Sequence, residues 1–150
     1  MIEEEGFISR ILANPANWPI YHIFADWLEE QDIPVAHYLR FVQGNPLVRK
    51  SFDGISCAWR RQGLQMRFTK KKLLCVMLHG QHGKFREYAG DLPAGLSFTD
   101  SPASTRDKLG PPTLHASNWD MYENLGFTVF YKFTKRQTLI EHVTITRCNR

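Results

Sequence analysis

The chain contains one pattern of glycine and apolar residues twice. The two copies lie 63 to 67 residues apart, and this small drift is what loop insertions produce after a unit has been duplicated and has diverged. A duplicated unit of this length builds a surface, and the repeated pattern contains no group of catalytic residues. The matching pairs are Gly44 and Gly110, Gly63 and Gly126, Phe68 and Phe133, and Val76 and Val143.

The composition fits a single folded domain with a hydrophobic core. The chain has 150 residues, of which 43% are hydrophobic and 13% aromatic, so it does not belong to the disordered class. The net charge is +4, with acidic residues frequent in the first 30 positions and basic residues frequent later. This asymmetry favours an acidic partner for the later part, although solvated surface charge is the commoner explanation.

We expect a cytoplasmic location. The three cysteines, Cys57, Cys75 and Cys148, have neither a metal-binding spacing nor the even number of a disulfide framework, which favours a reducing compartment. The first residues lack the basic and apolar regions of a signal peptide, and no apolar run approaches the length of a membrane span. A membrane partner is therefore not expected.

The first 43 residues predict three short amphipathic helices. Asn14-Pro15 ends the first helix, Pro19 suits the first turn of the second, and Gly44 ends the third. Helices of this length are not stable alone and must pack on one another or on a sheet. Their apolar stripes are Phe7, Ile8, Ile11 and Leu12; Ile20, Ile23, Phe24, Trp27 and Leu28; and Val35, Tyr38, Leu39 and Val42.

The later part has the two-residue period of strands. It predicts strands over 64–68, 73–78, 119–123, 127–133 and 139–146, and a short helix near 101–109. The fold class expected is α+β, with the N-terminal helices packed against an antiparallel sheet built from two degenerate helix–β-meander repeats. Phe127, Val129, Tyr131 and Phe133 should face the helices, because four large alternating apolar side chains need a cover.

Two parts of the chain resemble known groups of proteins. Residues 25–30 read Ala-Asp-Trp-Leu-Glu-Glu, and with the Asn-Pro turn before them residues 1–43 resemble the bacterial repeat-companion domain, for which no chemistry is implied. Residues 44–150, with Leu-Gly-Pro-Pro at 109–112 followed by strands, resemble the small α+β repeats of the β-lactamase inhibitor protein and of small outer-membrane lipoproteins. Residues 1–43 are then either a separate domain or the helical layer of the first repeat.

The sequence offers little catalytic chemistry. His79 and His82 could share a metal ion, but no third ligand lies near them in the sequence, so a solvated loop is the preferred interpretation. The serines and cysteines lie in no recognisable nucleophile motif, and no phosphate-binding loop is present. We expect no enzyme activity, no cofactor and no bound metal.

The aromatic and arginine residues favour protein binding. An inhibitor or immunity-type protein that covers an acidic partner protein with its sheet is the first hypothesis, because aromatic and arginine side chains are enriched at interfaces. For the two aromatic residues at equivalent places of the repeat, Trp59 and Tyr122, a core position is the stronger alternative. The predicted binding residues are Trp59, Arg61, Arg67, Trp119, Tyr122, Phe130 and Lys132.

Nucleic-acid binding is the second hypothesis. It would use two basic turns, Lys70 to Lys72 and Lys135-Arg136, together with a stacking aromatic ring such as that of Phe130. The small net charge places this hypothesis below protein binding.

Overall fold

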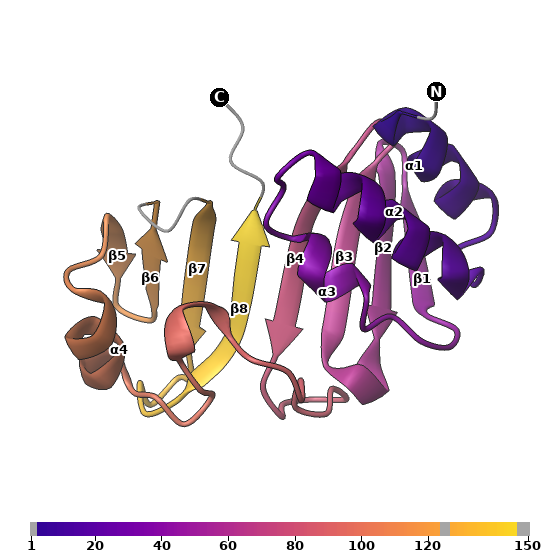
Figure 1. Ribbon diagram of the computed structural model, residues 1–150. Coiled ribbons are helices and arrows are strands. Elements are labelled where there is room, and N and C mark those ends of the chain that lie inside the picture. The colour runs from indigo at the N-terminus through magenta and orange to yellow at the C-terminus, as the bar shows by residue number, and fades with distance from the viewer. Residues whose placement is uncertain (1–2, 124–126, 147–150) are drawn as a thin grey trace.

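The computed structural model describes residues 3–123 and 127–146, so Gly126 and Cys148 lie outside the described residues. The described residues form one eight-stranded antiparallel sheet with four α-helices, which confirms the expected α+β class (Figure 1). The strand order is β1-β2-β3-β4-β8-β7-β6-β5. The helices are α1 (Glu4–Ala13), α2 (Trp18–Glu30), α3 (Ala36–Leu39) and α4 (Pro102–Leu109), and two 3-10 turns are η1 (Arg60–Gln62) and η2 (Pro93–Gly95). The strands are β1 (Leu47–Ser51), β2 (Gly54–Trp59), β3 (Leu64–Thr69), β4 (Leu73–His79), β5 (Leu114–Ala116), β6 (Trp119–Tyr122), β7 (Thr128–Phe133) and β8 (Ile140–Thr146).

Three of these strands were not predicted from the sequence. β1 and β5 are edge strands whose residues are almost all exposed, so neither shows an alternation of polar and apolar positions. β2 is buried at five of its six positions. Because residues on both of its faces are buried, β2 also shows no alternation of polar and apolar residues.

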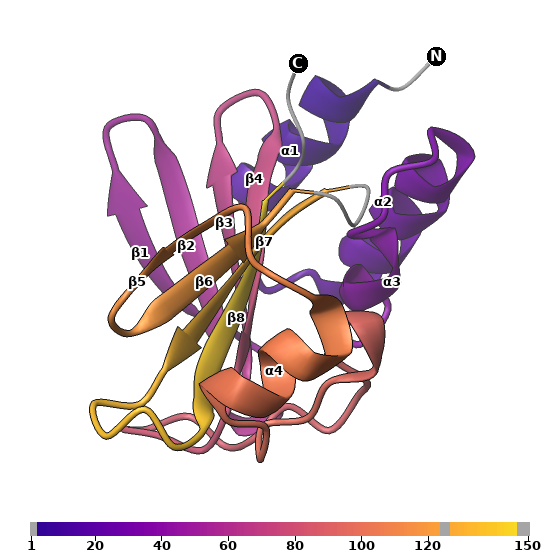
Figure 2. The same ribbon diagram turned by 90° about the vertical axis from the view of Figure 1, so that its left-hand side faces the viewer.

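The helices all lie on one face of the sheet (Figures 1 and 2). Buried residues of α1, α2 and α3 belong to the same hydrophobic cluster as buried residues of β2, β3, β4, β7 and β8. Val129, Tyr131 and Phe133 are buried in this cluster and Phe127 packs against it, so the predicted orientation of β7 is confirmed.

Helix α2 differs from its prediction at two positions. Its buried residues are Ile20, Tyr21, Phe24, Ala25 and Leu28. The centre of this face lies about a third of a turn from the side chain of Ile23, which is 53% exposed. Trp27 lies at the edge of the face and is half-buried, in ring contact with Phe7 and Phe24.

The two halves of the chain have the same strand register. Trp59 pairs with Leu64 in the first half as Tyr122 pairs with Val129 in the second, and the neighbouring pairs follow in step. The register shifts before Phe68 in β3 and before Phe133 in β7, which are the two phenylalanines matched in the sequence. A bulge kept at the same place indicates that the halves are copies of one unit.

The helix-to-strand connections are also equivalent. Gly44 and Gly110 both have positive φ angles, at 77° and 83°, a conformation that favours glycine. The indole N–H of Trp59 donates to the Gly44 carbonyl oxygen at 3.1 Å, and the Tyr122 hydroxyl donates to the Gly110 carbonyl oxygen at 2.9 Å. The same type of bond therefore fastens each short helix to the end of the second strand of its unit.

The two units meet at the pair β4–β8, and a pseudo-two-fold axis passes through this pair. Val76 and Val143 are equivalent in sequence, and the structure pairs Val76 with Ile145 and Val143 with Leu78. Both pairs are exchanged by a two-fold rotation about the pair formed by Met77 and Thr144. The sheet is thus continuous across the junction of the two units.

Candidate functional site

One face of the sheet has no helix on it among the described residues (Figure 2). We call it the open face, and it consists of the strand residues that alternate with those of the core. Its central row crosses all eight strands by direct pairing. The members of this row, in strand order, are Leu47, Ala58, Gln65, Met77, Thr144, Phe130, Met121 and Leu114.

Four of the predicted binding residues lie on the open face. Trp119 pairs with Lys132, and the ring of Trp119 lies 5.8 Å from that of Phe130, centroid to centroid. These two rings are half-buried, so part of each remains accessible. Arg67 is exposed on β3 at the position equivalent to Lys132, on the other side of the central row.

Two other predicted binding residues belong to the core. Trp59 and Tyr122 are only 3% and 0% exposed, and both point to the helix side of the sheet. Their assignment to a binding surface was wrong, and the alternative of a packing role describes them. Strand alternation decides this, because both residues are in register with buried residues, Leu64 and Val129.

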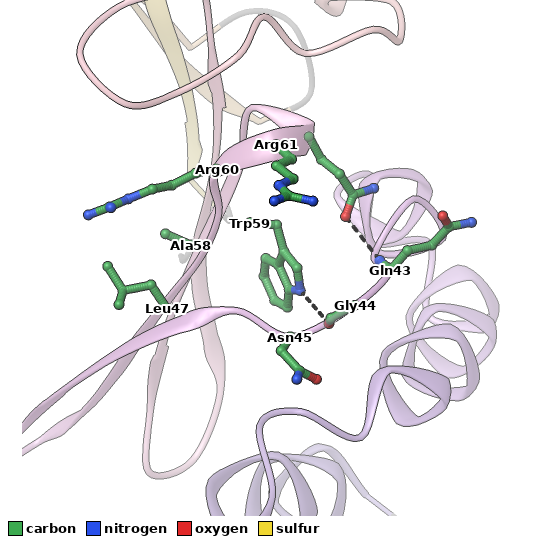
Figure 3. A pocket seen from close by; sticks show the side chains of 9 residues that line it. Gln43, Gly44, Asn45, Leu47, Ala58, Trp59, Arg60 and Arg61 are labelled. Carbon is green, nitrogen blue, oxygen red and sulfur yellow. Dashed lines mark hydrogen bonds between the residues drawn. The ribbon is translucent and has the colours of Figure 1, made fainter.

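The seventh residue, Arg61, is exposed at the rim of a pocket of about 370 Å³ (Figure 3). The pocket lies between η1 and the segment that leads from α3 to β1, with the indole of Trp59 as its inner wall. Gln62 closes one side by bonding to the Gln43 N–H and the Phe41 carbonyl. Among the described residues that line it, only Arg60 and Arg61 are ionisable, and two arginines do not form an acid–base pair.

The two basic turns do not form one surface. β3 and β7 are separated by β4 and β8 in an antiparallel sheet, so they run in opposite directions. The turn with Lys70 to Lys72 follows β3 and the turn with Lys135 and Arg136 follows β7, which places them at opposite ends of the sheet (Figure 1). The length of a six-residue strand, about 20 Å, therefore separates them along the strand direction.

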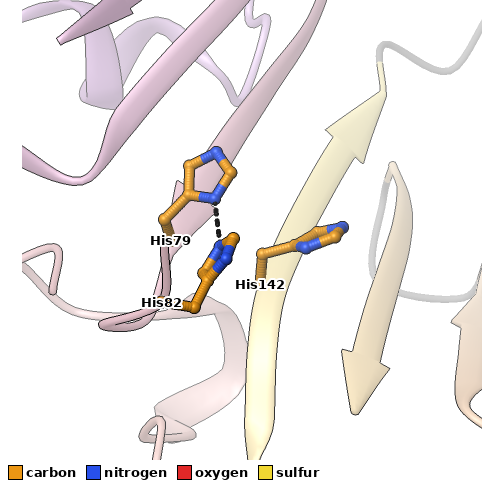
Figure 4. A group of neighbouring side chains, drawn as sticks. All are labelled: His79, His82 and His142. Carbon is orange, nitrogen blue, oxygen red and sulfur yellow. Dashed lines mark hydrogen bonds between the residues drawn. The ribbon is translucent and has the colours of Figure 1, made fainter. Parts of the chain in front are cut away.

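The structure adds a third histidine to His79 and His82. His142 of β8 pairs with His79 of β4 across the junction of the two units, so a third possible ligand, distant in the sequence, lies near them in the structure (Figure 4). One ring nitrogen from each histidine lies within 4.8 Å of the others. Sequence reasoning missed this group because His142 is 60 residues from His82, and only the β4–β8 pairing brings them together.

Glu141 and Lys132 lie beside these histidines. A Glu141 carboxylate oxygen is 3.7 Å from Nδ1 of His82, and the other is 3.5 Å from Nζ of Lys132. Burial, followed by the neighbouring His142 and His82, lowers the pKa of His79 to about 3. Burial, with Lys132 next, lowers the pKa of His142 to about 4. Both imidazoles are therefore neutral near pH 7.

No protein-family model, curated protein or solved structure matches this chain. Within residues 3–123 and 127–146, none of the helices combines the length and the apolar character that a membrane crossing needs. A functional proposal for this chain therefore depends on the residues of the open face.

Proposed function

We propose that this protein is a non-enzymatic binding module that covers an acidic partner protein with the open face of its sheet. The observation that carries the proposal is the pair of half-exposed rings, Trp119 and Phe130, flanked by Lys132 on a face that no described helix covers. Partly exposed aromatic side chains with cationic neighbours are the residues that contribute most binding energy in protein interfaces.

The shape of the open face supports a protein partner over a small ligand. Its central row runs across eight strands, which at about 4.8 Å per strand gives a width of about 34 Å. The row begins and ends with exposed leucines, Leu47 at 44% and Leu114 at 57%. A broad surface with apolar residues along its length suits another protein surface better than a small molecule, which needs an enclosed pocket.

The charges on the open face support an acidic partner. Arg49, Arg67 and Lys132 all point to this side. Two described acidic groups lie near them: Glu141 is paired with Lys132, and Asp53 lines the same pocket as Arg49 and Arg67. Helix α2, which carries Asp26, Glu29 and Glu30, lies on the other side of the sheet (Figure 2). An inhibitor or immunity-type role in the cytoplasm is the specific form of this proposal, because occlusion of a partner requires no catalytic group.

The first experiment identifies partners by their dependence on the open face. The tagged chain is used to capture proteins from an extract of its native cells, in parallel with a Trp119→Ser/Phe130→Ser variant and an Ile23→Ser control. Ile23 is an exposed apolar residue on the helix side, so it matches the change in hydrophobicity without touching the open face. The expected result is a protein retained by the wild type and the control and lost by the double variant.

The second experiment measures the identified complex. Trp119→Ala should weaken binding about thirtyfold, the effect of a hot-spot residue. Arg67→Glu should slow association and reduce its salt dependence, since the partner is acidic. Equal binding by the wild type and the double variant would contradict the proposal. Capture that is abolished by nuclease would instead favour nucleic acid, for which the separated basic turns provide no shared groove.

A further inference from the structure

We propose that His79, His82 and His142 bind a divalent transition-metal ion of the zinc class at the junction of the two repeat units. The three rings come from the end of β4, from the loop after it and from β8 (Figure 4). Their nearest ring nitrogens lie within 4.8 Å of one another. This inference is independent of the proposed protein binding.

The distances between the ring nitrogens require only a small rearrangement for the three histidines to bind one metal ion. Nitrogen ligands about 2.0–2.1 Å from a tetrahedral zinc ion lie about 3.3 Å from each other. His79 Nδ1 and His82 Nε2 are 2.8 Å apart, so this pair needs to open slightly while the nitrogen of His142 moves closer. His82 is in a loop, and rotation of its side chain can supply this change.

The hydrogen bond from Nε2 of His79 to Gln65 leaves the lone pair of Nδ1 available to a metal ion. His79 Nε2 lies 3.0 Å from the side-chain oxygen of Gln65, which can only accept, so Nε2 carries the hydrogen. The amide nitrogen of Gln65 donates to the Ser56 hydroxyl at 3.0 Å, so both ends of the amide have a partner in this arrangement. The lone pair of Nδ1 therefore faces His82. A metal-binding histidine is commonly oriented by such a bond from its second nitrogen to an oxygen.

His142 supplies an unused polar atom. Its Nδ1 is buried and has no hydrogen-bond partner among residues 3–123 and 127–146. A buried nitrogen without a partner costs free energy, and a ligand at this place would relieve that cost.

A shared hydrogen accounts for the 2.8 Å distance between His79 Nδ1 and His82 Nε2. With Nδ1 of His79 as acceptor, Nε2 of His82 carries the shared hydrogen. Metal binding at Nε2 requires that hydrogen to leave; neutral His82 then carries its proton on Nδ1, which faces Glu141. Glu141 also offsets the positive charge of Lys132, the group that opposes a cation here. Three imidazole ligands favour zinc, nickel or copper over magnesium or calcium.

The test is a titration of the purified, untagged chain after treatment with a chelator. Isothermal calorimetry with zinc chloride should give one site per chain, and cobalt(II) should develop the absorption of a tetrahedral complex. His82→Ala should abolish both signals, and Gln65→Leu should weaken zinc binding about 10- to 100-fold through the lost orientation of His79. His115→Ala, which removes an exposed histidine of β5, is the matched control and should bind as the wild type does.

Thermal unfolding separates loss of the site from loss of the fold. Zinc should raise the melting temperature of the wild type and of His115→Ala, since an ion that binds only the folded state stabilises it. His82→Ala should melt in chelator below the wild type, because the buried Nδ1 of His79 loses its hydrogen-bond partner, but it should still unfold cooperatively and gain nothing from zinc. Absence of a one-to-one heat signal in the wild type, or equal zinc binding by His82→Ala, would overturn the proposal.

Discussion

At the scale of single residues, two neighbouring tyrosines differ in whether their hydroxyl group makes a hydrogen bond. Tyr122 and Tyr131 are in edge-to-face contact, 5.8 Å between ring centroids, and both are fully buried. The Tyr122 hydroxyl donates to the Gly110 carbonyl oxygen, whereas the Tyr131 hydroxyl has no hydrogen-bond partner within the described part of the chain. Similar side chains in one core therefore make different contributions to stability.

The Tyr→Phe substitutions at these two positions should have different effects. Tyr122→Phe should lower the free energy of unfolding by about 0.5–1.5 kcal/mol, the net contribution of one hydrogen bond. Tyr131→Phe should leave it unchanged or raise it, because the lost hydroxyl is desolvated without compensation. Urea unfolding followed by circular dichroism measures both. Equal losses in the two variants would show that the hydroxyl contacts differ from those described.

Asp100 should make the protein sensitive to acid. Burial alone would raise the pKa of Asp100, but the Ser97 N–H, the Ser104 hydroxyl and Lys108 together lower it below the ordinary value. A carboxylate with a lowered folded-state pKa stabilises the fold above the unfolded pKa, about 3.9, and this stability is lost as the pH falls through the folded value. The stability that Asp100 contributes should therefore be lost below about pH 4.

The measurement compares the pH dependence of unfolding in two variants. Asp100→Asn should be less stable than the wild type at pH 7 and should lose less stability between pH 4 and 2. Asp107→Asn, which changes an exposed residue of α4, should keep the wild-type slope. A wild-type slope in Asp100→Asn would exclude Asp100 as a cause of acid sensitivity.

At the scale of elements, the two repeat units attach a helix to the sheet through different contacts at the same sheet position. In the second unit, Arg106 of α4 makes two hydrogen bonds to the fully buried carboxylate of Asp120 in β6, at 2.9 and 2.7 Å. In the first unit the position equivalent to Asp120 is Cys57, which contacts the hydroxyl of Tyr21 from α2. The same sheet position therefore accepts either an ion pair or a weakly polar contact.

Removal of Arg106 should be costly because it leaves a buried charge. Arg106→Met should lower the free energy of unfolding by about 3 kcal/mol, near the low end for a broken buried pair because the guanidinium is partly exposed. The double variant Arg106→Met/Asp120→Cys, which copies the first unit, should recover much of this loss. Chemical denaturation gives both values. A double variant less stable than Arg106→Met would mean that Asp120 has another buried partner.

On α2, Asp26 has a structural role, because it pairs with Arg40. Arg40 donates to Asp26 at 2.8 Å and also to Glu29, which fastens the segment after α3 to α2. The side chains are exposed, so Asp26→Asn should change the free energy of unfolding by less than about 1 kcal/mol. Urea unfolding at low and high salt checks this. A larger loss would assign Asp26 a role beyond the ion pair.

At the scale of the whole molecule, the two units share one core and one sheet. The buried cluster includes residues of α1 and residues of β8, and the β4–β8 pair continues the sheet between the units. We therefore expect cooperative unfolding of both units in a single transition. In a Trp119→Phe variant, the remaining tryptophans, Trp18, Trp27 and Trp59, all report on the first unit.

The midpoints of two probes should therefore coincide in this variant. Tryptophan fluorescence follows the first unit and far-ultraviolet circular dichroism follows the whole chain, so a shared midpoint indicates one cooperative transition. The wild type, measured in the same way, controls for the substitution. Separate midpoints would show that the repeat units unfold independently.

The sequence by itself determined the helices, five of the eight described strands and the existence of two units. The helical stripe around Phe24 and Leu28 and the alternation of β7 depend on side chains only a few positions apart, so a short window of residues is enough to recognise them. The same alternation places Arg67, Trp119, Phe130 and Lys132 on one face once the buried side is known. The exposed edge strands β1 and β5 have no such pattern and were not predicted.

Only the tertiary structure decided which distant residues meet. The pairing of β4 with β8 brings His142 to His79, and the directions of β3 and β7 separate the two basic turns. The side of the sheet that the helices cover buries Trp59 and Tyr122. These outcomes depend on how complete strands and helices pack, since burial of the shared core, rather than the preference of any short segment, selects the arrangement.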